Sequence, residues 1–127
     1  PLTDRRFAQR LQFVTGHAKS GEAPEHAWAS FAKDDATTVF YMGARTFAGM
    51  LPKMLAAGLS PATPAVAICA ATTPRRRTVS AAGAELPAAL ATLDGGAPCL
   101  IVVGRCAAEV AAETAPAVEP AARAVLL

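Results

Sequence analysis

The side chains of this 127-residue chain that could do chemistry are few and scattered. His17 and His26 are nine residues apart with no cysteine near either, so their spacing does not suit a metal ion. Cys69 and Cys99 adjoin predicted strand ends, without a neighbouring histidine or lysine to activate a thiol nucleophile. No serine stands in a nucleophile elbow, and no glycine-rich phosphate loop is present. We therefore predict no metal site and no catalytic residue in this chain.

The cysteines also bear on the cellular compartment. Cys69, Cys99 and Cys106 are an odd number of thiols without the spacing of metal ligands. This usage is typical of reduced thiols in a cytoplasmic protein, where disulfides are rare. We therefore predict a cytoplasmic location and three reduced cysteines.

Cationic side chains cluster at Arg75-Arg76-Arg77. Guanidinium groups bind carboxylates or phosphates through paired hydrogen bonds, so the triplet could hold an anionic ligand. A solvated hairpin or loop explains it at least as well, and both interpretations stay open. His17 follows Thr15-Gly16 at a predicted strand end. Its side chain could face a pocket or be solvated, and these two interpretations also stay open.

A predicted strand at residues 37–42 (TTVFYM) is the element around which the chain is organised. It stops at Gly43 and passes into a helical pattern. In α/β proteins, ligands bind outside the carboxyl ends of strands, where such a turn leads into a helix. Met42 and Gly43 are therefore predicted to form the wall of a pocket.

The remaining pattern supplies the other elements of an α/β domain. Residues 100–103 (LIVV) form a continuous apolar run, which is typical of a central strand covered on both faces. Further strands are predicted at 10–15, 66–68 and 78–81, and helices at 25–32, 47–55 with a kink at Pro52, 85–93 and 109–114. The alternation of strands and helices predicts a three-layer α/β domain with about five strands.

Length and composition favour one folded domain without a nucleic-acid or membrane partner. The chain is 53% hydrophobic, and its net charge of +2 is too small to indicate a polyanionic partner. It has neither a strongly apolar run of eighteen residues nor a basic leader. We assign residues 1–104 to the domain and 105–127 to an alanine- and proline-rich tail, partly helical or disordered. Because the chain begins at Pro1 without an initiator methionine, we expect a fragment of a longer protein.

Seven short blocks follow one another along the predicted domain: 1–5 (PLTxR), 13–17 (FVTGH), 39–43 (VFYMG), 55–59 (LAAGL), 63–67 (TPxVA), 72–77 (TTPxxR) and 100–104 (LIVVG), where x marks a position outside the match. In this order and at this spacing they resemble the C-terminal half of the uroporphyrinogen-III C-methyltransferases, within the tetrapyrrole methylase family. No block is specific by itself, but the ordered set is strong evidence.

The resemblance implies a two-lobed enzyme that dimerises and binds a tetrapyrrole substrate. Such enzymes transfer methyl groups from S-adenosylmethionine to two ring carbons of uroporphyrinogen III, which yields precorrin-2 for siroheme or cobalamin. The methyl donor lies between the lobes, and the C-terminal lobe holds its adenosine side. The implied fold of that lobe is a mixed sheet of about five strands flanked by helices.

The resemblance also nominates site residues. The donor-contacting methionine of the family's YMG motif falls on Met42, with Gly43 beside it. Two further donor-contacting positions fall on Ala71 and Cys99. Arg77 and His17 are weaker candidates for contacts with the substrate.

The chain departs from the family pattern in three respects. The usual Glu-x-Gly before the TTP turn is Cys69-Ala70-Ala71 here, and the usual Gly-Thr after the arginine strand is about Ala81-Ala82. The N-terminal lobe, which in the family carries a glycine-rich loop and the acid/base residues, is absent from these residues. We therefore expect the chain alone to bind the donor poorly and not to turn over.

Two alternatives remain. The first is another precorrin methyltransferase of the same family. The second is a non-catalytic α/β module that binds an anionic partner through Arg75–Arg77.

Overall fold

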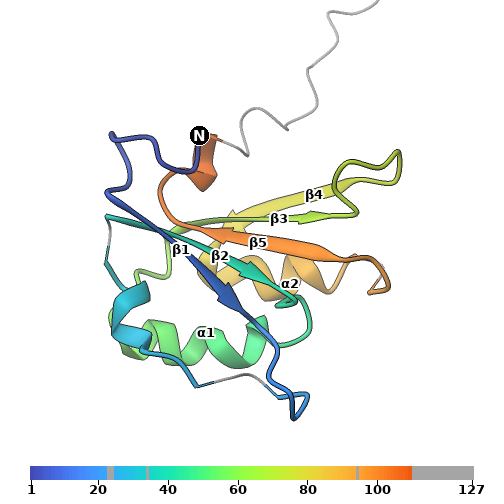
Figure 1. Ribbon diagram of the computed structural model, residues 1–127, viewed down its shortest axis with the longest axis horizontal. Coiled ribbons are helices and arrows are strands. Elements are labelled where there is room, and N and C mark those ends of the chain that lie inside the picture. The colour runs from blue at the N-terminus through green and yellow to red at the C-terminus, as the bar shows by residue number, and fades with distance from the viewer. Residues whose placement is uncertain (23–24, 34, 94, 110–127) are drawn as a thin grey trace, which may run out of the picture.

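The computed structural model describes residues 1–22, 25–33, 35–93 and 95–109, and its centre is a five-stranded sheet (Figure 1). The strands are β1 (Arg10–Thr15), β2 (Ala36–Tyr41), β3 (Pro64–Cys69), β4 (Arg77–Ala82) and β5 (Cys99–Val103), in the order β1-β2-β5-β3-β4. β1 and β2 are parallel, whereas the other three pairings are antiparallel. The predicted mixed sheet of five strands is confirmed, and the apolar run of β5 occupies its centre.

The main helix is α1 (Phe47–Ala56), which follows the turn at Gly43 as the apolar stripe predicts. It buries Phe47, Met50, Leu51 and Met54, although Pro52 lies inside it. The helix ends because Gly58 adopts a φ of 111°, a conformation that L side chains rarely take.

The two faces of the sheet are covered differently. One face packs on α1, on the 3-10 helix η1 (Trp28–Phe31) and on α2 (Leu86–Leu90). The largest fully buried side chains between this face and the helices are Phe40, Phe47, Met50, Met54, Leu86 and Ile101. The other face packs Val39, Val66 and Val102 against Cys106 and Ala107, with Leu2 and Phe7 of the N-terminal segment at its margin. Burial of each large apolar side chain stabilises the fold by about 1.5–3 kcal/mol.

Two predicted helices are shorter than their patterns indicate. Of the helix predicted at 25–32, only the single 3-10 turn η1 forms. The predicted helix was too long because Trp28 and Phe31 share a face in a 3-10 helix as well as in an α-helix. The helix predicted at 85–93 is divided into the 3-10 turn η2 (Gly83–Glu85) and α2, which ends at Leu90.

The tail is described only as far as Glu109, so the helix predicted at 109–114 lies almost wholly outside the described residues. Within the described ranges, no helix combines the length and apolar character needed to cross a membrane.

Candidate functional site

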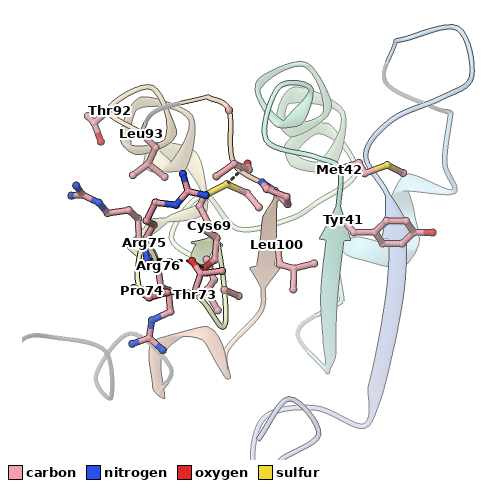
Figure 2. A pocket seen from close by; sticks show the side chains of 18 residues that line it. Tyr41, Met42, Cys69, Thr73, Pro74, Arg75, Arg76, Thr92, Leu93 and Leu100 are labelled. Carbon is pink, nitrogen blue, oxygen red and sulfur yellow. Dashed lines mark hydrogen bonds between the residues drawn. A yellow bond between two sulfur atoms is a disulfide. The ribbon is translucent and has the colours of Figure 1, made fainter.

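An open cavity of about 1340 Å³ lies at one edge of the sheet, where β2 and β3 end and the antiparallel β5 begins (Figure 2). Its lining comes from residues 41–42, 68–71, 73–77, 92–93 and 96–100. The cavity is larger than the roughly 300–1,000 Å³ that is typical of small-molecule pockets. The ends of three neighbouring strands thus converge on one concave surface, as expected for a ligand site in an α/β protein.

The structure brings most of the nominated residues to this cavity. Met42, Ala71, Cys99 and Arg77 all line it, although they come from three segments far apart in the sequence. The buried Gly43 and the exposed His17 are not among the lining residues. The backbone N–H of His17 donates instead to the Thr15 hydroxyl at 3.3 Å, as part of the turn after β1.

Gly43 supports the cavity from behind. A Cβ placed on Gly16 would lie 2.3 Å from the Gly43 Cα, so the turns after β1 and β2 pack backbone against backbone. Gly16 N–H donates to the Tyr41 carbonyl at 2.8 Å, and the Thr46 hydroxyl donates to the Gly16 carbonyl. Gly16 and Gly43 therefore join the turns after β1 and β2 into one structural unit that places Tyr41 and Met42.

Met42 has an unusual backbone conformation. Its φ is 56°, in the left-handed region that few residues other than glycine adopt, and its side chain is 58% exposed. Ala70 and Thr72, in the loop that follows β3, also have positive φ values, of 50° and 63°. Backbone conformations of this kind cluster at ligand sites, where the surrounding structure must hold them.

The loop after β3 is braced by its own side chains. The Thr73 hydroxyl donates to the Ala70 carbonyl at 2.7 Å and accepts from the Arg75 N–H at 3.2 Å. These two bonds of the Thr73 hydroxyl fix the loop on either side of Ala71 and Pro74.

The arginine triplet gives the cavity a positively charged side. Arg75, Arg76 and Arg77 are exposed, and none of them forms an ion pair with the described residues. In Figure 2, Arg75 and Arg76 lie on the opposite side of Leu100 from Tyr41 and Met42. The described lining residues include no histidine, lysine, aspartate or glutamate. The arrangement can therefore bind a ligand that is partly apolar and partly anionic.

The cysteines correct a prediction. Cys69 and Cys99 are not reduced thiols but form a disulfide, and only Cys106 is free. The antiparallel register of β3 and β5 places these two cysteines directly opposite each other, with their Cα atoms 4.0 Å apart. Sequence reasoning missed the pair because their separation of 30 residues does not reveal the strand register.

Among the described residues, the groups with shifted pKa values lie on the surface and do not line the cavity. Hydrogen bonds from Arg6 lower the pKa of Asp4 to about 2. Hydrogen bonds from Lys53 and Trp28 lower the pKa of Glu25, which ties the segment before η1 to α1. No metal-binding group of three or more His, Cys, Asp or Glu side chains occurs among the described residues.

Comparison with known proteins agrees with the sequence blocks. The chain is 42% identical over 104 residues to siroheme synthase 2 of Halorhodospira halophila, and 36% identical over 105 residues to the uroporphyrinogen-III C-methyltransferase of Synechocystis. Both alignments cover 82% of this chain, but only 21% and 40% of the relatives. The chain is therefore similar to one part of each of these longer proteins. No family model matches it.

Solved structures show the same relationship. The native uroporphyrin III C-methyl transferase of Thermus thermophilus matches with a TM-score of 0.73 at 29% identity, over 92% of this chain and 49% of that one. The same enzyme complexed with S-adenyl homocysteine matches with a TM-score of 0.70 at 28% identity, over 87% and 48%. The chain thus spans about half the length of these solved enzymes, and less than half of the curated relatives.

Proposed function

We propose that the chain is the C-terminal, adenosine-side lobe of an S-adenosylmethionine-dependent methyltransferase that converts uroporphyrinogen III to precorrin-2. The observation that carries the proposal is the convergence of Met42, Ala71 and Cys99. The resemblance nominates all three as donor contacts from separate stretches of the sequence, and all three line one cavity. A thioether, a methyl group and a sulfur atom offer an apolar surface for an adenine ring.

The rest of the proposed enzyme lies outside this chain. A second lobe closes the open cavity over the donor and supplies the proton-transfer groups, since the described lining has no acid/base pair. This lobe alone is then inactive and binds the donor poorly. The reaction is displacement at the sulfonium methyl by a pyrrole carbon, in which the lobe contributes positioning of the donor.

The arginine side of the cavity fits the proposed substrate. Uroporphyrinogen carries several carboxylates, and Arg77 stands with Arg75 and Arg76 beside the proposed donor site, without acidic partners among the described residues. His17 contributes no cavity surface, so we retain only Arg77 as a substrate contact. We further propose that the complete enzyme is a cytoplasmic homodimer.

The test is calorimetry with S-adenosylhomocysteine on the protein in which both lobes are present. Met42→Asp should weaken binding at least tenfold, which is about 1.4 kcal/mol, because a charge replaces the apolar contact. Aspartate tolerates a positive φ, so the backbone at this position should not be disturbed.

Phe13→Asp is the matched control, because Phe13 is 66% exposed but does not line the cavity. It should leave the affinity unchanged. Equal affinities of Met42→Asp and the unaltered protein would refute the assignment of Met42.

The second candidate is a module that binds an anionic partner without catalysis, and the same three arginines, which have no ion-pair partner among the described residues, favour it. The two functions predict different ligands. The proposed enzyme binds S-adenosylhomocysteine whether or not Arg75–Arg77 are changed to glutamine, whereas the module has no affinity for this ligand.

A further inference from the structure

Cys69 and Cys99 form a cross-strand pair at the floor of the cavity. They occupy the last register position of the β3–β5 ladder, and both line the cavity. The Ala70 N–H donates to the Pro98 carbonyl at 2.9 Å, just beyond the pair, so the two cysteines face each other at a position without mutual backbone hydrogen bonds. Facing side chains are closest at such positions of an antiparallel sheet.

We propose that Cys69 and Cys99 are a reversible thiol–disulfide site that fastens and releases the two loops walling the cavity. Its oxidant is a low-molecular-weight disulfide, and its reductant is a low-molecular-weight thiol or dithiol. This inference goes beyond the proposed function and does not depend on it.

The two cysteines differ in access. Cys69 is 3% exposed, whereas Cys99 is half-buried and reachable from the open cavity. The Sγ of Cys99 lies 3.6 Å from the Ala97 carbonyl oxygen, which can accept a hydrogen bond from the reduced thiol. Exchange with a soluble partner therefore begins at Cys99, and Cys69 resolves it.

The chemistry balances without any further reactant. The Cys99 thiolate attacks one sulfur of the low-molecular-weight disulfide, forms a mixed disulfide and releases one small thiolate. The Cys69 thiolate then attacks the Cys99 sulfur and releases the second small thiolate. Two electrons pass from the cysteines to the small disulfide, and the two cysteine protons end on the two released thiols.

The sheet keeps the pair ready to close again. The pairing of β3 with β5 runs from Ala65–Val103 to Cys69–Cys99, so four of its five register positions lie away from the disulfide. Those four positions hold the two strands together after reduction, so frayed ends can pair again and bring the thiols back opposite each other. In reducing compartments, disulfides that form are usually transient or redox-sensing, which suits a site of this kind.

The Cys69–Cys99 disulfide affects the two loops that line the cavity. β3 ends at Cys69 and leads directly into residues 70–76, while residues 95–98 lead directly into Cys99. A bond at the last ladder position prevents these strand ends from fraying. Cleavage permits fraying, and the positive φ values of Ala70 and Thr72 then lose part of their support.

Cys106 serves as an internal reference. It is 2% exposed, its Sγ lies 3.2 Å from the Thr37 hydroxyl, and it packs on the face of the sheet with Val39 and Val102. It should remain a free thiol in both redox states.

The test is hydrogen exchange read by mass spectrometry, on the chain equilibrated with oxidised or reduced glutathione, together with a thiol count after denaturation. We expect one alkylatable thiol, Cys106, in the oxidised state and three in the reduced state. Residues 70–76 and 95–98 should exchange at least tenfold more slowly in the oxidised state. The Cys69→Ser/Cys99→Ser double variant should exchange like the reduced chain in both buffers.

Three free thiols in the oxidising buffer, or a disulfide that includes Cys106, would overturn the proposal. Equal exchange of the loops in the two states of the unaltered chain would also overturn it, even if the double variant failed to fold. No methyl donor is present in the experiment, so failure of the proposed function would not affect the outcome.

Discussion

The cavity has two walls that are held in place by different means. The first, which we call the glycine wall, is Tyr41–Met42 with the Gly16–Gly43 contact behind it. The second, the cysteine wall, consists of residues 69–77 and 96–100, and the Cys69–Cys99 bond joins its two strands. The glycine wall depends on the absence of a side chain, whereas the cysteine wall depends on a bond that a thiol can cleave.

This difference separates a fixed part of the site from an adjustable part. The close backbone contact between Gly16 and Gly43 contains no bond that solution conditions can make or break. Any Cβ at Gly16 would displace the turn that places Met42. The disulfide has two states at neutral pH. We therefore expect the glycine wall to be sensitive to mutation and insensitive to conditions, and the cysteine wall to respond to redox conditions.

The largest effect should come from Gly16→Ala. The added Cβ would meet backbone atoms of Gly43 that cannot move aside as a flexible side chain can, so we expect a loss of about 4 kcal/mol in the free energy of unfolding. Urea denaturation measures this loss.

Gly49→Ala is the matched control, because Gly49 lies inside α1 and a Cβ there meets nothing within 4 Å. It should stabilise the chain by about 0.5–1 kcal/mol, since alanine is the better helix former. Equal effects of the two substitutions would show that the glycine wall is not close-packed.

A smaller effect should come from reduction of the cysteine wall. The two cysteines are 30 residues apart, and loss of the bond that closes this loop should lower the free energy of unfolding by about 3.6 kcal/mol. Thermal unfolding with and without a reductant measures the change, and the Cys69→Ser/Cys99→Ser variant should be insensitive to the reductant. A reductant effect that persists in the variant would place the sensitive bond elsewhere.

The smallest effect concerns the segment that joins the glycine wall to η1. The folded-state pKa of Glu25 lies below its ordinary value, mainly because Lys53 donates a hydrogen bond to it. The pair therefore favours folding at neutral pH, and this contribution is lost as the pH falls through the folded pKa of Glu25. Lys53→Met should raise that pKa toward its ordinary value, as an NMR titration would show; an unchanged pKa would assign the shift to Trp28.

Much of the fold could be predicted from local pattern. The continuous apolar run of β5 and the stripe Phe47, Met50, Leu51, Met54 are each fixed by burial, and the elements follow them closely. Single helical turns were less predictable, because the three-residue spacing of Trp28 and Phe31 fits two kinds of helix.

The site could be predicted only in part, for a physical reason. Met42, Ala71 and Cys99 were nominated from ordered sequence blocks, but their common cavity arises from long-range strand pairing. The disulfide depends on the β3–β5 register, and the left-handed conformation of Met42 depends on the tertiary contact between Gly16 and Gly43. Neither leaves a local pattern in the sequence.

A crystal structure of the protein with both lobes, bound to S-adenosylhomocysteine, tests the central proposal most directly. We predict that the adenosine part of the ligand contacts Met42, Ala71 and Cys99 in the cavity at the ends of β2, β3 and β5. Adenosine bound away from these three residues, with the cavity left to another ligand, would contradict the proposed function.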